Sequence, residues 1–136
     1  MAVKPLASPR VISLRDLADE SFVSLTTFRR SGEGVATTVW VTADPDGDGL
    51  VVMTIDGSGK VKRVRGNPRV TLRPCGRMGG VEEGAPTVEA TARVGEFSER
   101  IEQAFKDAYG AEFHVVRGVE RLTSDRQRVA LHLSAL

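Results

Sequence analysis

The sequence predicts a mainly β protein, an antiparallel barrel with short helices at its edge. About six segments have the composition or the alternation of strands, against three or four short helical segments. The connections between the first strands are too short for crossover helices, which disfavours a doubly wound parallel sheet. With 136 residues, 40% of them hydrophobic and 27% charged, the chain is long enough for one core without disulfides or metals. We therefore expect a single domain over 1–136.

The first half of the chain is predicted to form a short helix and three strands. Residues 1–12 contain two prolines and no period, which indicates a flexible arm. Ser13 begins the helix, with Asp16 at the capping-box position. The strands are separated by turns rich in Gly, Asp and Ser, and they are expected over 21–30, 35–43 and 50–55.

The second half is predicted to alternate between helices and strands. Val88, Ala90, Ala92 and Val94 alternate with polar residues, which is the clearest strand pattern in the chain. The expected elements are a helix over 60–65, strands over 69–74 and 87–94, an amphipathic helix that begins at Ser98 and ends before Gly110, a weaker helix over 112–122 and a strand over 127–133.

One stretch of the chain is strongly basic, although the formal net charge is only +1. The interval between Asp56 and Glu82 contains no acidic residue and 7 of the 19 basic ones: Lys60, Lys62, Arg63, Arg65, Arg69, Arg73 and Arg77. The turn Gly57-Ser58-Gly59 leads into the predicted helix and exposes backbone N–H groups at its positive end. This pattern favours an anion site, with phosphate as the natural ligand. The alternative is a solvated basic face without a ligand.

Other binding motifs are incomplete. The Walker pattern fails because Thr54 and Val61 stand where it needs glycine and a hydroxyl. The aspartates of 44–49 resemble a calcium loop, but Ile55 occupies the position of its essential glutamate, so a plain turn is expected. His114 and His132 have no neighbours at ligand spacing, so both are expected on the surface of a helix or strand, and no metal site is predicted.

The single cysteine, Cys75, cannot form an internal disulfide. Arg73 and Arg77 beside it favour a lowered pKa, although a small buried thiol is the more common explanation. No Ser–His–Asp or Cys–His arrangement suggests nucleophilic catalysis. Aromatic residues at 5% disfavour a nucleic-acid platform, which ranks last among the functions considered. The chain has neither a signal-peptide pattern nor a long apolar stretch, so we expect a cytoplasmic protein without a membrane span.

Three segments, 22–27, 37–41 and 58–70, resemble the deazaflavin-dependent oxidoreductases of the pyridoxamine-phosphate-oxidase-like split-barrel superfamily. The later strand over 89–92 and the helix that ends near Tyr109-Gly110 add to the resemblance, which extends roughly from Leu14 to Leu133. The likeness rests on the order and spacing of these segments rather than on one specific motif. It implies a six-stranded antiparallel split β-barrel that forms a homodimer, with a cofactor at each subunit junction.

The cofactor that the resemblance implies is the deazaflavin F420, with flavin mononucleotide (FMN) as the alternative. F420 carries an acidic glutamyl tail, so the basic residues over 60–77 favour it over FMN. By the resemblance, the phosphate is held by Ser58, Lys60, Lys62 and Arg63, and the ring is lined by Thr37, Thr38, Val39, Trp40, Met53 and Thr54, while Val61 is also expected among the cofactor-binding residues. Arg73, Arg77 and Met78 are expected to border the substrate mouth or the dimer mate.

The implied function is hydride transfer between F420 and a small electron-poor acceptor such as an enone or a quinone. The protein then mainly orients the two rings and excludes water, and the proton comes from solvent or from a hydroxyl such as that of Thr38. Two alternatives stay open. The first is an FMN-binding split-barrel oxidoreductase, and the second is a non-catalytic carrier of F420 or of another ligand such as a porphyrin or a fatty acid.

Overall fold

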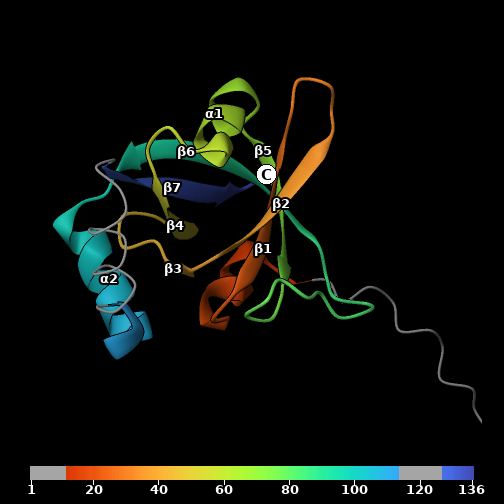
Figure 1. The fold of residues 1–136 in the computed structure, drawn as a ribbon. Coiled ribbons are helices and arrows are strands. Elements are labelled where there is room, and N and C mark those ends of the chain that lie inside the picture. The colour runs from red at the N-terminus through yellow and green to blue at the C-terminus, as the bar shows by residue number, and fades with distance from the viewer. Residues whose placement is uncertain (1–11, 114–126) are drawn as a thin grey trace, which may run out of the picture.

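A computed structural model describes residues 12–113 and 127–136. Its strands form one antiparallel sheet, accompanied by short helices (Figure 1). The strands are β1 (Val23–Phe28), β2 (Gly34–Val39), β3 (Val41–Ala43), β4 (Leu50–Ile55), β5 (Arg69–Pro74), β6 (Val88–Glu96) and β7 (Arg128–Ala135). The helices are the 3₁₀ helix η1 (Leu14–Asp19), α1 (Gly59–Gly66) and α2 (Glu99–Tyr109). Within the described residues, no helix has the length and apolar character needed to cross a bilayer.

The sheet closes on itself as a barrel. Its strand order is β2-β1-β5-β6-β7-β4-β3, so β2 and β3 are its two end strands, yet only Trp40 separates them in the chain. A sheet whose end strands belong to one continuous segment has to curve round, which confirms the predicted antiparallel barrel. The described residues contain seven strands instead of six, because the run over 35–43 divides at Trp40. Val39 is the last residue paired with β1, and Val41 is the first paired with β4.

Two apolar clusters stabilise the barrel. Alternate residues of β1 and β5, such as Leu25 and Leu72, point into its interior, where Val61 and Val64 of α1 join them. A second cluster lies between the outer face of the sheet and α2, and it consists of Val51, Ile101, Phe105, Phe113 and Ala130. Because β4 serves both clusters, it has a continuous apolar sequence rather than an alternating one. Burying each large apolar side chain contributes about 1.5–3 kcal/mol.

The predicted helix boundaries agree with the capping contacts. The Ser13 N–H donates to the Asp16 carboxylate at 2.8 Å, although the helix that follows is a 3₁₀ helix. Ser98 Oγ accepts the Ile101 N–H at 3.2 Å, and Gly110 follows the last residue of α2 with a positive φ of 59°. The predicted arm over 1–12 and the predicted helix over 112–122 lie almost entirely outside the described residues.

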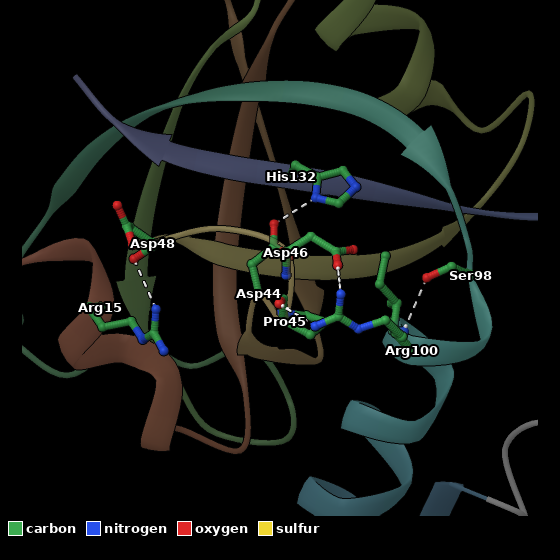
Figure 2. A network of polar contacts seen from close by, with 9 residues as sticks. Arg15, Asp44, Pro45, Asp46, Asp48, Ser98, Arg100 and His132 are labelled. Atoms are coloured by element: carbon green, nitrogen blue, oxygen red, sulfur yellow. Dashed lines mark hydrogen bonds and ion pairs between the residues drawn. The ribbon is translucent and has the colours of Figure 1, made fainter.

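The turn between β3 and β4, residues 44–49, is fixed by polar contacts (Figure 2). Asp44 Oδ2 lies 2.6 Å from His132 Nδ1, and Asp44 Oδ1 accepts the Asp46 N–H at 2.8 Å. Arg100 of α2 donates to the Pro45 carbonyl oxygen and pairs with the Asp46 carboxylate. No group of three or more potential metal-ligating side chains occurs among the described residues.

The predicted surface position of His132 is wrong, because its side chain is buried and the residue is 8% exposed. It lies on β7, which pairs with β4 on one side and β6 on the other, and the 44–49 turn covers it. Gly95 on β6 leaves room for the imidazole, since a Cβ at that position would lie 2.9 Å from the ring. The other histidine, His114, lies outside the described residues.

Candidate anion site at the start of helix α1

The cations of the basic stretch differ in whether they contact a carboxylate or a backbone carbonyl oxygen. Four of its side chains do: Arg65 contacts Asp56, Arg69 contacts Glu89, Arg77 contacts Glu112, and Arg73 contacts the Ala85 carbonyl oxygen. The remaining three are Lys60, Lys62 and Arg63, which have no carboxylate partner in the described part of the chain. All three belong to α1, so the unpaired positive charge is concentrated on one short helix.

Arg63 is held against the first turn of its own helix. Its Nε donates to Thr27 Oγ1 at 2.6 Å, and Thr27 on β1 is fully buried. The guanidinium lies directly over Gly59, because a Cβ built at Gly59 would be only 2.7 Å from Arg63 Nη1. A positive charge therefore stands at the N-terminus of α1.

The helix also begins with free backbone donors. Ser58 is the N-cap residue, but its hydroxyl caps no helix N–H and instead lies 3.4 Å from Thr54 Oγ1. The N–H groups of Gly59, Lys60 and Val61 consequently have no acceptor among the described residues. Such groups attract an anion, and the helix dipole adds to the attraction.

Lys60 is the second cation at this end of α1. Its partial burial, and secondarily the charge of Arg63, lower the pKa of Lys60 below its usual value of 10.5. A lowered lysine pKa means that this environment disfavours the ammonium form. An anion bound between Lys60 and Arg63 would reverse that effect, which is a common property of ligand sites.

An open groove of about 750 Å³ continues from Arg63 along α1. It lies between α1 and the tip of the β1–β2 hairpin, which are at the same end of the barrel (Figure 1). Its cationic lining consists of Arg29, Arg30, Lys62, Arg63 and Arg65. The sequence pattern did not predict that Arg29 and Arg30 lie near α1. Two adjacent arginines at the end of a predicted strand indicate local positive charge, but only the curvature of the sheet brings them to α1.

The residues predicted to line a ring on β2 have different environments. Val39 is buried in the barrel core, Thr38 is exposed, and Thr37 is half-buried with its Oγ1 unpaired among the described residues. Trp40 stacks on Tyr109 of α2, with ring centroids 4.1 Å apart and planes 8° apart. One face of the Trp40 ring is therefore occupied by the protein itself.

Met53 and Thr54 are neighbours on β4 but point to opposite faces of the sheet. Thr54 is buried beside Ser58 and belongs to the candidate anion site. Met53 packs against the cluster under α2, where its sulfur lies 3.3 Å from Arg128 Nη1. The structure therefore brings Thr54 together with the predicted phosphate residues and does not bring Met53 there. Val61 is fully buried, so its side chain serves the core and not the site.

The predicted substrate residues lie at the end of β5 that is remote from α1: Arg73 is in the last part of the strand, and Arg77 and Met78 follow it. Met78 is 94% exposed, and the Arg77 guanidinium lies 5.6 Å from the centre of the Phe22 ring. Cys75, in the same loop, is half-buried beside a hollow of about 370 Å³. Burial raises the pKa of the Cys75 thiol, contrary to the lowering that its neighbouring arginines favour.

Solved structures share this fold, whereas no protein-family model and no curated protein sequence matches the chain. The heme storage protein HutZ from Vibrio cholerae matches with a TM-score of 0.62 and 14% identity over 92% of each chain. An F420 reductase matches with a TM-score of 0.53 and 15% identity over 93% of this chain and 97% of the other. A putative pyridoxamine 5'-phosphate oxidase from Listeria innocua matches with a TM-score of 0.52 and 16% identity over 87% and 86%.

The chain therefore has the split-barrel fold of the pyridoxamine-phosphate-oxidase-like proteins. The names of these neighbours describe a heme storage protein, an F420 reductase and a putative oxidase. Because one fold serves several functions, the function has to be argued from the site.

Proposed function

We propose that the protein is an F420-dependent oxidoreductase that holds the phosphate of its cofactor at the start of α1. The observation that carries this proposal is the coincidence of unpaired cations and unpaired N–H groups at one helix end. Lys60 and Arg63 contact no carboxylate in the described residues, and Gly59 begins a turn whose N–H groups have no acceptor there. A phosphate group would satisfy both sets of donors.

The groove beside the site favours F420 over FMN. The phosphate is the end of the FMN molecule, whereas in F420 the chain continues into an acidic glutamyl tail. The groove continues from Arg63 and places Arg29, Arg30 and Lys62 where a second set of negative charges would lie. Arg29 already contacts Glu33 at the surface, but a ligand that ends at its phosphate would leave Arg30 and Lys62 without a carboxylate partner among the described residues.

The residues of this chain would bind and orient the cofactor. When bound, reduced F420 supplies a hydride to an electron-poor acceptor. Lys60 and Arg63 would fix the phosphate through their cationic side chains. The exposed hydroxyl of Thr38 is the candidate proton donor to the product. We also propose that the active form is a homodimer with the ring at the subunit junction.

The test is a fluorescence titration of the purified protein with F420, and with FMN and hemin in parallel, at moderate salt. We expect micromolar binding of F420, weaker binding of FMN, and oxidation of reduced F420 by an added enone or quinone. Tighter binding of FMN would assign the protein to the flavin-dependent enzymes. Binding of F420 without turnover would support a carrier, and binding of hemin alone would overturn the proposal.

A further inference from the structure

We propose that Thr27 is a positioning residue, which acts through Arg63 to prepare the α1 site for its anion. This inference rests on the proposed function, because it concerns the same site. It adds a residue that contacts no ligand and comes from a different part of the chain. Thr27 lies on β1, 36 positions before Arg63.

The Thr27 hydroxyl has no evident role in packing. Thr27 belongs to the row of β1 side chains that face the barrel core, after Val23 and Leu25, and all three are fully buried. Valine has the same shape as threonine and an equally good strand propensity, so packing alone does not require a hydroxyl here. The contact that the hydroxyl makes is with Arg63, whose Nε donates to it at 2.6 Å.

This contact leaves the ligand-binding part of Arg63 free. Binding through Nε fixes the plane of the guanidinium and leaves its two terminal nitrogens for a bidentate contact with phosphate. A free arginine side chain loses considerable rotamer entropy when a ligand immobilises it. The hydrogen bond to Thr27 already restricts the Arg63 side chain in the free protein. Less rotamer entropy is then lost on binding, which strengthens binding through preorganisation.

Gly59 is compatible with the same guanidinium position. Its φ is not positive, so its backbone conformation is open to other residues, and alanine would be a better helix former. The space over Gly59 is occupied by Arg63, since a Cβ at Gly59 would lie 2.7 Å from Nη1 and would displace the guanidinium from its present position. Thr27 holds the guanidinium from one side, and the absence of a side chain at Gly59 makes room for it on the other.

The tether also acts against a repulsion. Arg63 contributes to the lowered pKa of Lys60, which shows that the two cations lie close enough to disfavour each other. A long surface arginine would relieve this repulsion by turning into solvent. The Thr27 contact prevents that movement and keeps both charges ready for a shared anion.

The first experiment compares F420 binding to three variants. Thr27→Val removes the hydroxyl and keeps the shape, Thr27→Ser keeps the hydroxyl, and Thr42→Val alters another buried threonine, on β3 away from the site. We expect Thr27→Val to raise the Kd about tenfold, while Thr27→Ser and Thr42→Val stay within about twofold of wild type. Equal losses for Thr27→Val and Thr27→Ser would overturn the proposal.

The second experiment tests whether Thr27 acts through Arg63. In an Arg63→Ala background the hydrogen bond between Thr27 and Arg63 is already absent. Thr27→Val should therefore have no further effect on the Kd. A tenfold effect that persists in this background would show a general structural role and overturn the inference.

The third experiment needs no cofactor. The Nε–H of Arg63 should give a solvent-protected ¹⁵N NMR signal in wild type and in Thr27→Ser, and the protection should be lost in Thr27→Val. A protected signal in a protein that does not bind F420 would overturn the proposed function and leave the tether intact. An unprotected signal in a protein that binds F420 would overturn the tether and leave the proposed function intact.

Discussion

The start of α1 and the turn over 44–49 lie at opposite ends of β4, and both are rich in charged side chains. In the turn, Asp44 contacts His132 and Asp46 contacts Arg100, so two of its three carboxylates have partners within the protein. At the start of α1, Lys60 and Arg63 contact no carboxylate among the described residues. The difference shows that a charge cluster serves the fold when its partners are internal and indicates a ligand when they are missing.

The largest effect is expected from breaking the internally paired cluster. Asp44→Ala leaves the His132 Nδ1 and the Asp46 N–H without their acceptor, which should lower the free energy of unfolding by about 2–4 kcal/mol. Urea unfolding measures the loss, and the Kd for F420 should not change because the turn is remote from α1. Asp46→Ala is the control, and should cost less than about 1 kcal/mol, because its ion pair with Arg100 is exposed.

The corresponding change at α1 should act on binding. Lys60→Ala removes one cation from the anion site, and we expect it to weaken F420 binding by about 1.5–3 kcal/mol, or roughly 10- to 150-fold in Kd. Fluorescence titration measures this effect. Arg69→Ala is the matched control from the same basic stretch, since Arg69 is exposed and already pairs with Glu89. A similar loss in both variants would mean that only the overall charge matters.

A third variant tests another polar group whose hydrogen bonds are satisfied within the protein, the Tyr109 hydroxyl. Tyr109 Oη accepts the Val41 N–H at 2.9 Å and can donate to the Ser21 carbonyl oxygen at 2.8 Å. Tyr109→Phe keeps the stack on Trp40 but removes these bonds, which should cost about 1–3 kcal/mol of unfolding free energy. Chemical denaturation measures the difference. A variant as stable as wild type would contradict the stabilising role of the Tyr109 hydroxyl.

The pH dependence of the free energy of unfolding should also report on Tyr109. Burial raises the pKa of Tyr109 from 10.0 to about 12, so the folded state keeps the phenolic proton that the unfolded state loses. This contribution to stability is complete below pH 10 and is lost as the pH rises through about 12. Wild type should therefore lose more stability than Tyr109→Phe over that interval. Parallel curves for the two proteins would contradict the assignment.

The sequence was informative about local features and less so about which charges meet. The period-two pattern of β6, the cap at Ser98 and the basic stretch near α1 depend on neighbouring residues, and all could be predicted. The division at Trp40 could not, because it depends on which strands pair with β2 and β3. The contacts of the cations could not be predicted either, since Arg69 meets a carboxylate 20 positions away and Arg63 meets a hydroxyl 36 positions away.

Lys60→Met provides the most direct test of the claim that the α1 cations await an anion. The lowered pKa of Lys60 means that its charge destabilises the folded protein at neutral pH when no anion is bound. Bound cofactor stabilises only the folded state, in proportion to its affinity. The measurement is the melting temperature of wild type and Lys60→Met, without F420 and with saturating F420. We predict that the variant is the more stable protein without F420 and the less stable one with it. The same order of stability in both conditions would contradict the claim.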